Sequence, residues 1–437
     1  MSQIVYKLGG TSQCKKGYDR LINILKEKQD CTIFIVLSAV SGVTNNLVKF
    51  TETKDISYIE KAIHLNQLLL KDLDIEHMYI YYLYKELRDK ANEFIKSFNI
   101  SDIYIKSEII GYGEILSSDI FEMYLTLQEL PKKQKLYNSH KLLNSYDYIF
   151  SKKEIYQCNS NVEFFASENL NELCYSDRHN IFIMQGFIAS TPSLKKVLLG
   201  RGGSDTTGSL VASSINADYY EVWTDVDGIY TCDPRIFTEA QLVKNIDYEL
   251  VQELSAMGAK VMHPLSIKPC TDSNIPIYVK NTFNELSEGT CITTTADIRR
   301  DDIFYAIQKS QTVFKIKSLD MWNSYGFITD IFRCFSENRI DVNIVTTSQF
   351  SISTTTSETN KYKLLEIQDY LREKYEVEMI QECTIFSIVT KNIKDIFHKF
   401  NFKNINAEII HISDNNMTLN IVLKEFSADL IKTIYIL

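Results

Sequence analysis

A glycine-rich segment at residues 199–208 carries residue types suited to binding an anion. It reads Leu-Gly-Arg-Gly-Gly-Ser-Asp-Thr-Thr-Gly and sets the guanidinium of Arg201 near the hydroxyl of Ser204 and the carboxylate of Asp205. Glycines let backbone N–H groups approach a ligand closely, and successive N–H groups form an anion-binding concavity. Ser204 onward predicts a helix start, which also attracts anions. We therefore expect a phosphate or carboxylate ligand here, with helix capping as the alternative role of Ser204 and Asp205.

A second candidate site follows the first expected strand, Ile4–Leu8. Lys7 precedes Gly9, Gly10 and the hydroxyl of Thr11. A lysine at the carboxyl end of a strand, followed by a glycine turn and hydroxyls, is typical of a phosphate clamp at the edge of an α/β sheet. The order differs from a Walker A loop, in which the lysine follows the glycines. The alternative is a tight turn with a solvated lysine.

Two further polar positions fit a small-molecule site. Residues 38–44, Ser-Ala-Val-Ser-Gly-Val-Thr, follow a buried strand, and Thr44 either lines a pocket or caps the next helix. Glu114 is expected early in a helix, after Gly111 and Gly113. The simplest interpretation is a solvated residue in the first turn that is stabilised by the helix dipole. A role in binding is expected only if the substrate carries an ammonium group.

A carboxylate-rich turn follows the strand that ends at Thr224. Asp225 suits a ribose hydroxyl or magnesium, Tyr230 suits a base, and Arg235 suits phosphates. An Asp-Gly turn with ordinary charge pairs is the alternative. Lys260 follows an expected helix end, where a cation is also stabilised by the helix dipole.

Alternating strands and helices over the first two thirds of the chain predict the scaffold for these residues. The expected strands are Ile4–Leu8, Thr32–Leu37, Ile181–Ile188, Tyr219–Thr224 and Pro276–Lys280. The expected helices are Gly17–Lys28, one or two within Tyr58–Phe98, Gly113–Leu130 and Tyr248–Met257. This alternation favours an α/β sandwich around a mostly parallel sheet.

The pattern changes near Arg299 and then repeats. The first unit has expected strands at Val313–Ile316, Val342–Val345 and Ser351–Thr355 and helices at Tyr325–Asn338 and Lys361–Arg372, with a polar loop at Thr354–Asn360. A similar order begins at Thr384, with helices at Ile393–Phe400 and Ala428–Ile434 and strands at Ala407–Ile412 and Thr418–Val422. Two such units indicate a repeated small α+β module.

Composition restricts the class of protein and its partners. The chain has 437 residues, enough for two or three domains, and its 45% hydrophobic and 24% charged residues are typical of a globular protein. A net charge of −9 without a basic stretch argues against nucleic acid or an anionic membrane as a partner. Nine scattered cysteines without a C-x-x-C pair favour reduced thiols in the cytoplasm over disulfides or a zinc site. No signal-peptide core or membrane-spanning run is expected.

Taken in order, the motifs resemble those of the aspartokinases, within the amino-acid kinase superfamily. They are K-x-G-G-T-S, S-A-x-x-G-x-T, G-R-G-G-S-D-T-T, T-D-V-D-G-I-Y-x-x-D-P-R and G-A-K-V-M-H-P. The resemblance implies a three-layer αβα sandwich with a mostly parallel sheet in residues 1–295. Residues 317–332 and 342–348 resemble the paired regulatory ACT modules of lysine-sensitive, monofunctional aspartokinases. The implied ferredoxin-like (βαββαβ) modules are 296–380 and 381–437, and the first strand of the former is a candidate for contribution to the latter.

The resemblance also implies an activity, the transfer of the ATP γ-phosphoryl group to the β-carboxylate of L-aspartate. The products would be ADP and 4-phospho-L-aspartate, on the route to lysine, threonine, methionine and diaminopimelate. Such a transfer relies on positioning and charge stabilisation, with Mg²⁺ held mainly by the phosphates and no metal-binding side chain assigned. The implied catalytic residues are Lys7 and Asp205. The implied aspartate-binding residues are Thr44, Glu114, Phe187, Arg201 and Ser204. The implied nucleotide- and phosphate-binding residues are Gly9, Gly10, Thr11, Thr224, Asp225, Tyr230, Arg235 and Lys260.

Feedback by L-lysine through the ACT modules is a further implication of the resemblance. The matching effector residues are Met321, Ser324, Gly326, Phe327, Ile328, Val342 and Asn343. Lysine-sensitive relatives usually carry an aspartate where this chain has Asn343, and losing that carboxylate weakens binding of a cation by about 1–3 kcal/mol. Asp341, two residues earlier on an expected strand, is a candidate replacement. Paired ACT modules imply a homodimer or homotetramer.

Two other functions fit part of the sequence. One is a kinase of the same superfamily that acts on glutamate, N-acetylglutamate, carbamate or a nucleotide; the paired regulatory modules argue against it. The other is an inactive amino-acid sensor that kept the fold. The presence of Lys7, Arg201 and Asp205 argues against a sensor without activity.

Overall fold

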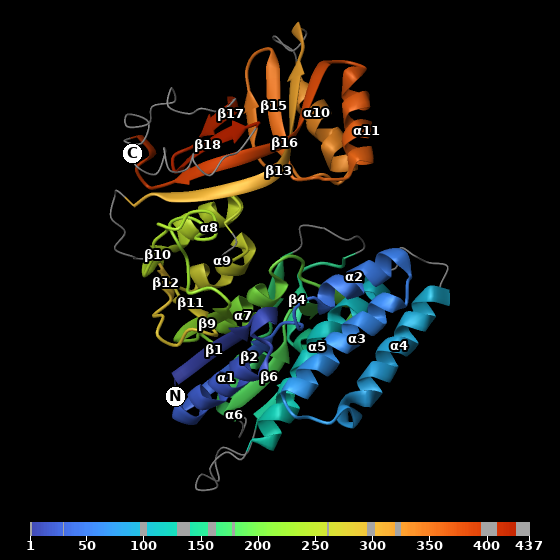
Figure 1. Ribbon diagram of the computed structural model, residues 1–437, viewed down its shortest axis with the longest axis vertical. Coiled ribbons are helices and arrows are strands. Elements are labelled where there is room, and N and C mark those ends of the chain that lie inside the picture. The colour runs from blue at the N-terminus through green and yellow to red at the C-terminus, as the bar shows by residue number, and fades with distance from the viewer. Residues whose placement is uncertain are drawn as a thin grey trace. The chain divides into compact units, whose positions relative to one another are not determined.

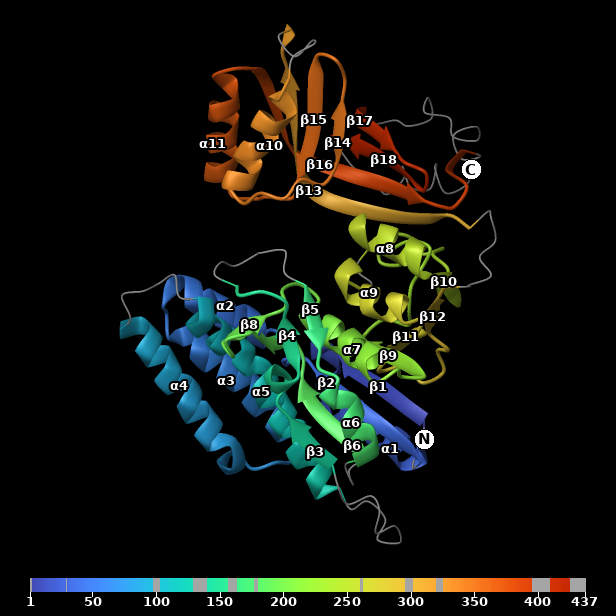
Figure 2. The same cartoon turned by 180° about the vertical axis from the view of Figure 1, so that it is seen from behind.

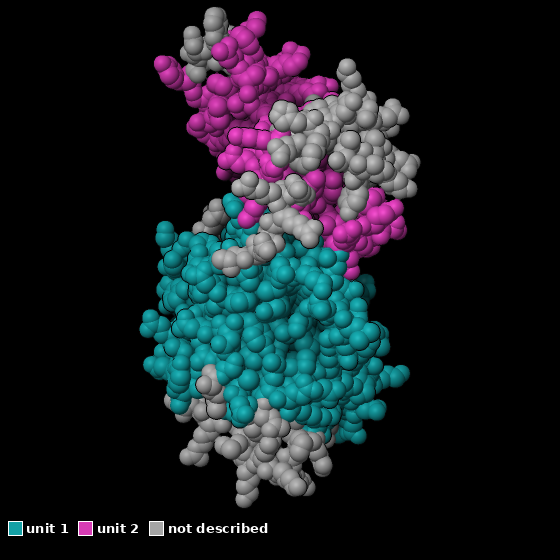
Figure 3. Space-filling model, turned by 90° about the vertical axis from the view of Figure 1, so that its left-hand side faces the viewer, with its two compact units in different colours: residues 1–229, 242–252, 261–297 teal, residues 230–241, 253–260, 298–437 magenta. Residues whose placement is uncertain are grey.

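The computed structural model divides the chain into two compact units (Figure 3). It describes residues 2–28, 30–96, 103–128, 140–155, 163–176, 180–259, 262–294, 302–319, 325–394 and 409–424. The first unit comprises Met1–Ile229, Leu242–Gln252 and Val261–Asp297. The second comprises Tyr230–Gln241, Glu253–Lys260 and Ile298–Leu437. The expected boundary at residues 295 and 296 lies outside the described residues.

A mostly parallel sheet forms the centre of the first unit (Figure 1). The described strands follow the order β10-β12-β11-β9-β1-β2-β6-β3, and within this sheet only the described pair β11–β12 is antiparallel. The bounds are β1 (Ser2–Leu8), β2 (Cys31–Leu37), β3 (His140–Leu143), β6 (Ile181–Gln185), β9 (Tyr219–Thr224), β10 (Asn245–Asp247), β11 (Ile277–Asn281) and β12 (Thr290–Thr293). In β1 every residue after Ser2 is buried, as expected for a strand that is covered on both faces.

Helices cover both faces of this sheet (Figures 1 and 2). On one face, α1 to α5 form a hydrophobic core with alternate β1 residues, Ile4, Tyr6 and Leu8. The opposite face carries Lys7 and helix α7, with α6 and α9 packed against α7. The bounds are α1 (Lys15–Glu27), α2 (Val43–Thr53), α3 (Ser57–Asp72), α4 (Tyr81–Lys96), α5 (Ile103–Leu127), α6 (Asn169–Ser176), α7 (Gly203–Ser214), α8 (Tyr248–Ala256) and α9 (Pro264–Asp272). The predicted αβα sandwich is confirmed.

Helix α5 begins ten residues before the expected start at Gly113. Glycine in a helix interior is unfavourable, which made Gly111 and Gly113 resemble a helix boundary. Packing explains them instead, because a Cβ on Gly113 would lie 2.8 Å from the Cβ of Ala39. The long segment before α5 forms two helices, α3 and α4, separated by the short 3₁₀ helix η2 (His77–Ile80).

The expected strand Ile181–Ile188 is confirmed in its first part, but its expected end is too late, because the chain turns before Ile188. Strand β6 stops at Gln185, and Phe187 takes a left-handed conformation with φ 68°. Ile188 then starts β7 in a separate four-stranded sheet of order β5-β4-β7-β8. Its bounds are β4 (Ile149–Ser151), β5 (Phe164–Ala166), β7 (Ile188–Ser190) and β8 (Lys196–Leu198), and the short 3₁₀ helices nearby are η1 (Gly10–Ser12) and η3 (Ser145–Asp147).

The described strands of the second unit form a six-stranded antiparallel sheet. Its order is β14-β15-β13-β16-β18-β17. The bounds are β13 (Phe304–Lys317), β14 (Val345–Thr347), β15 (Ser351–Thr356), β16 (Glu376–Val389), β17 (Ile409–Asp414) and β18 (Thr418–Leu423), with helices α10 (Phe327–Glu337) and α11 (Lys361–Arg372). The first part of β13 pairs with the end of β16, and its second part pairs with the start of β16 and with β15. Both long strands are therefore shared between the two halves.

Two local expectations for this unit differ from the structure. The expected strand Val342–Val345 is displaced, because the ladder starts only at Val345. Just before it, Asn343 N–H donates to Thr355 O, and Thr355 N–H donates to Ile344 O, so two residues face one as in a β-bulge. The expected loop Thr354–Asn360 begins later, because β15 continues to Thr356. Most of the expected helix 393–400 and all of 428–434 lie outside the described residues.

Among the helices of the described segments, none is both long enough and apolar enough to cross a membrane.

Candidate functional site

The carboxyl ends of four parallel strands meet at one edge of the central sheet. Backbone hydrogen bonds hold the loops that leave them together: Gly9 N–H donates to Trp223 O over 3.0 Å, and Ser38 N–H donates to the last carbonyl of β1 over 3.2 Å. Gly186 N–H donates to the last carbonyl of β2 over 2.8 Å. Loops after β1, β2, β6 and β9 therefore lie side by side, at the edge where α/β sheets bind their ligands.

Lys7 and Asp205 form the charged centre of this edge. Lys7 Nζ lies 2.6 Å from Asp205 Oδ1, and Lys7 is only 8% exposed. Asp205 stands in the first turn of α7, whose N-cap is Gly202 in the left-handed conformation, and no side chain caps this helix. Helix capping by Ser204 or Asp205 is therefore wrong. The Tyr220 hydroxyl donates to the backbone oxygen of Asp205 over 3.1 Å and fixes this turn on β9.

Glu114 lies in the middle of α5 and not in its first turn. Its residue exposure is 3%, and burial raises the pKa of its carboxyl to about 8, against the opposing effects of a hydrogen bond from the Ala39 backbone and the charge of Lys7. Its Oε2 is buried without a hydrogen-bond partner. A buried carboxylate oxygen without a partner is costly, so Oε2 suits a cationic or hydrogen-donating ligand group.

The end of β6 packs directly on the start of α7. A Cβ on Gly186 would lie 2.5 Å from the Cβ of Ser204. Phe187 N–H donates to Thr207 Oγ1 over 3.0 Å, and its left-handed backbone is unusual for a bulky residue. Such strained positions cluster at binding sites. The backbone of Phe187 and the side chain of Ser204 are thus brought together.

The remaining expected residues around this centre occupy loop and helix ends. Gly10 is in close contact, since a Cβ there would lie 2.8 Å from Ala39 O, whereas Thr11 is exposed. Thr44 follows the first residue of α2, whose N-cap is Gly42, so Thr44 is not the cap. Arg201 is exposed and forms no ion pair with any described residue. Its guanidinium is available to a ligand.

The expected nucleotide-binding residues are divided between the two units. Thr224 and Asp225 lie in the first unit, where the Thr224 hydroxyl donates to Asp225 Oδ1 over 3.2 Å. Tyr230 and Arg235 belong to the second unit, and Arg235 makes two side-chain hydrogen bonds to Asp233, at 2.9 and 2.7 Å. Lys260 lies outside the described residues.

The expected effector residues lie in the second unit, and two of them, Met321 and Ser324, fall outside the described residues. Gly326 has φ 86° and precedes α10, Phe327 begins this helix, and Ile328 is 46% exposed. Val342 packs against the core of this half. Asn343 Nδ2 donates to Gln311 Oε1 over 2.8 Å, so its amide is already hydrogen-bonded within the protein.

Sequence reasoning missed residues that hold two of these loops together. They are Ser12, Asp227, Asn281, Thr282 and Asn284. The sequence did contain a signal for these residues. Strand β11 ends at Asn281, and the segment Asn-Thr-Phe-Asn at 281–284 is rich in short polar side chains. At the carboxyl edge of a parallel sheet, such side chains often contact a ligand or a neighbouring loop.

Comparison with known proteins places this geometry among amino-acid kinases. Residues 2–281 match the model of the amino acid kinase family. Aspartokinase 2, chloroplastic, of Arabidopsis thaliana is 26% identical over 97% of this chain and 82% of the relative. Two structures of E. coli aspartokinase III share 22% identity and a TM-score of 0.79: the complex with lysine and aspartate (99% of this chain, 98% of the other) and the complex with aspartate and ADP (100% and 99%). This likeness in structure shows the fold.

Proposed function

The chain belongs to the amino acid kinase family, and from this premise we propose that it is an aspartate kinase that transfers the γ-phosphoryl group of ATP to the β-carboxylate of L-aspartate. One observation supports the acceptor most directly: Glu114 is buried beside the charged centre and leaves Oε2 without a partner. The α-ammonium of an amino acid is a group that such a carboxylate would bind, since it supplies both charge and hydrogen bonds.

Aspartate would be held at its other groups by the remaining residues of this edge. Arg201 offers a planar fork that matches a carboxylate, and no described residue competes for it in an ion pair. Thr44 and Ser204 would add hydroxyl contacts, and the backbone of Phe187 would border the same pocket. This division leaves the β-carboxylate directed toward Lys7.

In the reaction, an oxygen of the β-carboxylate forms a bond to the γ-phosphorus while the bond from that phosphorus to the bridging oxygen of ADP breaks. The electron pair of that bond leaves with ADP, so the products are 4-phospho-L-aspartate and ADP. The carboxylate is already ionised, and no general base is required. Lys7, oriented by Asp205, would stabilise the charge on the transferred group, and N–H groups of Gly9 and Gly10 would bind phosphate oxygens.

The nucleotide would bind along the loops after β1 and β9, with Thr11, Thr224 and Asp225 as contacts. Tyr230, Arg235 and Lys260 stay predicted contacts from the resemblance to aspartokinases. Mg²⁺ typically binds through phosphate oxygens and one or two carboxylates. Asp225, exposed at the end of β9, fits that role, and the ion would neutralise phosphate charge.

Regulation and assembly belong to the same proposal. L-lysine would inhibit by binding the ACT modules near Gly326, Phe327, Ile328 and Asn343, together with Met321, Ser324 and Val342. Support comes from the E. coli structure in complex with lysine. The modules would join copies of the chain into a homodimer or homotetramer, which light scattering tests. The location in the cytoplasm remains a prediction from cysteine usage.

ATP-dependent hydroxamate formation tests the proposed activity. Hydroxylamine traps an acyl phosphate, so the protein is incubated with ATP, Mg²⁺ and hydroxylamine, with aspartate, with glutamate or without an acceptor. Product with aspartate alone is expected. Product with glutamate, or none with any acceptor while the protein is folded, would contradict the assignment.

A further inference from the structure

We propose that residues 281–284, the 281–284 clamp, fix the loop after β1 against the loop after β9, and that Thr282 and Ser12 are positioning residues for nucleotide binding. The inference rests on the proposed function, since it takes the first loop to bind phosphates and the second to bind the nucleotide. The clamp and the loop residues that it contacts, Ser12, Thr224 and Asp227, all belong to the first unit.

A pair of buried hydroxyls forms the first contact of the clamp. Ser12 Oγ and Thr282 Oγ1 lie 2.6 Å apart, and both side chains are fully excluded from solvent. Ser12 Oγ also donates to Trp223 O over 3.3 Å, so the Thr282 hydroxyl is the donor to Ser12. The same Trp223 carbonyl accepts the Gly9 N–H over 3.0 Å. A relay of hydrogen bonds therefore runs from the clamp through the loop after β1 to the end of β9.

The clamp also holds the loop after β9 from its other side. Thr282 N–H donates to Thr224 O over 2.8 Å. Asp227 Oδ1 accepts two amide hydrogen bonds, from Asn281 over 2.7 Å and from Asn284 over 3.0 Å. These bonds fix the backbone on both sides of Asp225, which is the exposed carboxylate proposed to face the nucleotide.

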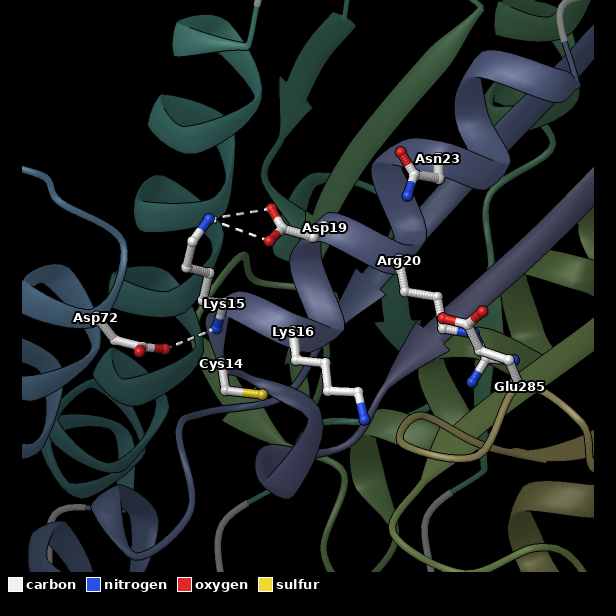
Figure 4. Close-up of a pocket in the computed structure, with 8 residues that line it drawn as sticks. All are labelled: Cys14, Lys15, Lys16, Asp19, Arg20, Asn23, Asp72 and Glu285. Carbon is white, nitrogen blue, oxygen red and sulfur yellow. Dashed lines mark hydrogen bonds and ion pairs between the residues drawn. The ribbon is translucent and has the colours of Figure 1, made fainter.

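Helix α1 supports the clamp from behind (Figure 4). Lys16 Nζ donates to Phe283 O over 3.1 Å, and the Arg20 guanidinium donates to Asn281 O while lying 4.9 Å from the centre of the Trp223 ring. Figure 4 shows both side chains extending from α1 toward the loop that carries Glu285, around an open cavity of about 450 Å³. Lys16 and Arg20, which line this cavity, therefore hold the clamp from the side of α1.

This arrangement predicts that one methyl-for-hydroxyl exchange disturbs the nucleotide site without removing any ligand contact. In Thr282→Val the backbone bond to Thr224 remains, and Ser12 keeps its bond to Trp223, but the hydrogen bond that links the clamp to the loop after β1 is lost. A hydrogen bond of this kind corresponds to an affinity change of about 3- to 10-fold. Small misplacement of bound phosphates also lowers the rate of transfer.

The experiment compares Thr282→Val with Thr282→Ser in the full chain. Calorimetry with ADP and Mg²⁺ measures nucleotide affinity, and the hydroxamate assay measures KM for ATP and for aspartate. We expect Thr282→Val to weaken ADP binding and raise KM for ATP by about 3- to 10-fold, with KM for aspartate unchanged. Thr282→Ser keeps the hydroxyl and should restore the wild-type values. Ser213→Ala, which breaks the 2.7 Å hydroxyl pair with Ser273 on α9's end, is the matched control and should leave all three values unchanged.

Each outcome decides the proposal. The proposal is overturned if Thr282→Val leaves the affinity for ADP unchanged or raises both KM values equally. It is also overturned if Thr282→Ser fails to restore ADP binding. If Thr282→Val does not fold, Ser12→Ala breaks the same relay from the other side and is judged by the same criteria. A wild-type protein that binds ADP but forms no aspartyl hydroxamate overturns the proposed acceptor alone, because the ADP titrations still decide the role of the clamp. A wild-type protein that binds no ADP overturns both.

Discussion

Lys7 at the end of β1 and Asp205 in the first turn of α7 form an ion pair with 2.6 Å between Nζ and Oδ1. The parallel sheet explains this contact, since Lys7 projects from the face that α7 covers. Both side chains are mostly buried, so their charges are weakly screened by solvent. In the proposed reaction, this pair would hold the Lys7 ammonium ready for the transferred phosphoryl group.

Replacing Lys7 by Ala should lower kcat by about a thousandfold, because a charge that acts mainly in the transition state is lost. Thermal unfolding should still be cooperative, with the free energy of unfolding reduced by about 1–3 kcal/mol, since Asp205 loses its partner. Lys268→Ala, which breaks an exposed pair with Asp272, is the control and should retain activity. Wild-type kcat in Lys7→Ala would show that the catalytic assignment is wrong.

Aspartate binding should strengthen as pH rises toward the pKa of Glu114. In the free protein this carboxyl, with a pKa of about 8, is mostly protonated at pH 7, and only the ionised form attracts an ammonium. KM for aspartate should therefore fall between pH 6 and pH 8. In Glu114→Gln, KM should be at least about tenfold higher and independent of pH in this range. Exposed Glu52→Gln on α2 is the control. The same pH dependence in Glu114→Gln would exclude Glu114 as its origin.

The same carboxyl should affect stability. Its folded pKa lies above its ordinary value of 4.5, so the unfolded chain loses its proton first as pH rises. The free energy of unfolding of the ligand-free protein should consequently decrease between pH 4.5 and about 8, and part of that decrease should be absent in Glu114→Gln. Urea unfolding at several pH values measures this. If the free energy of unfolding depends on pH in the same way in both proteins, the Glu114 carboxyl does not have a raised pKa.

Arg201→Lys should raise KM for aspartate about tenfold or more, because an ammonium cannot replace the planar fork that binds a carboxylate by two bonds. The nucleotide KM should stay constant. Arg88→Lys is a matched control, since Arg88 binds Glu60 by two bonds, at 2.7 and 2.8 Å, on the surface of α4. Equal KM values in wild type and Arg201→Lys would remove Arg201 from the aspartate site.

Two glycines of α5 allow a graded test of packing around Glu114. Alanine favours a helix over glycine by about 1 kcal/mol, so propensity alone predicts stabilisation. In Gly113→Ala the new Cβ would lie 2.8 Å from Ala39 and 3.0 Å from Val43, and we expect net destabilisation of about 1–3 kcal/mol and a higher KM for aspartate. In Gly111→Ala the contacts are the side-chain ends of Ile188 and Leu198, and the effect should be smaller. The reverse order would contradict this packing.

Feedback inhibition should depend on position 343. L-lysine should inhibit the wild-type enzyme, and Asn343→Asp should lower the half-inhibiting concentration about tenfold by adding a carboxylate. Gln311 must reorient, because its Oε1 now accepts the Asn343 amide. Activity titrations with L-lysine measure both proteins. A flat response up to tens of millimolar in both would exclude lysine as the effector.

The sequence alone determined the bounds of those helices and strands whose pattern of apolar residues fits only one type of secondary structure. Tyr219–Thr224 and Lys361–Arg372 match their predicted bounds, because a buried apolar run and an amphipathic period specify them locally. The order of Gly-rich and carboxylate-rich loops along the chain pointed to phosphate chemistry and to the family, and the mostly parallel sheet followed from alternation of strands and helices. These features depend on residue type and spacing and need no knowledge of distant contacts.

Only the tertiary structure decided what individual polar residues do. The middle of α5 tolerates Gly113 because Ala39 packs against it, and that same packing buries Glu114, which sequence reasoning had placed in a solvated first turn. Strand β6 ends at Gln185 because the chain turns at Phe187 into β7, and the Phe187 N–H donates to Thr207 on α7; the apolar residues around Phe187 in the sequence give no sign of this turn. Asp205 pairs with Lys7 instead of capping its helix, and Thr282 meets Ser12, because pairing brings β1, β9 and β11 to one edge. Such contacts join residues that are far apart in the chain, so the local sequence pattern cannot predict them.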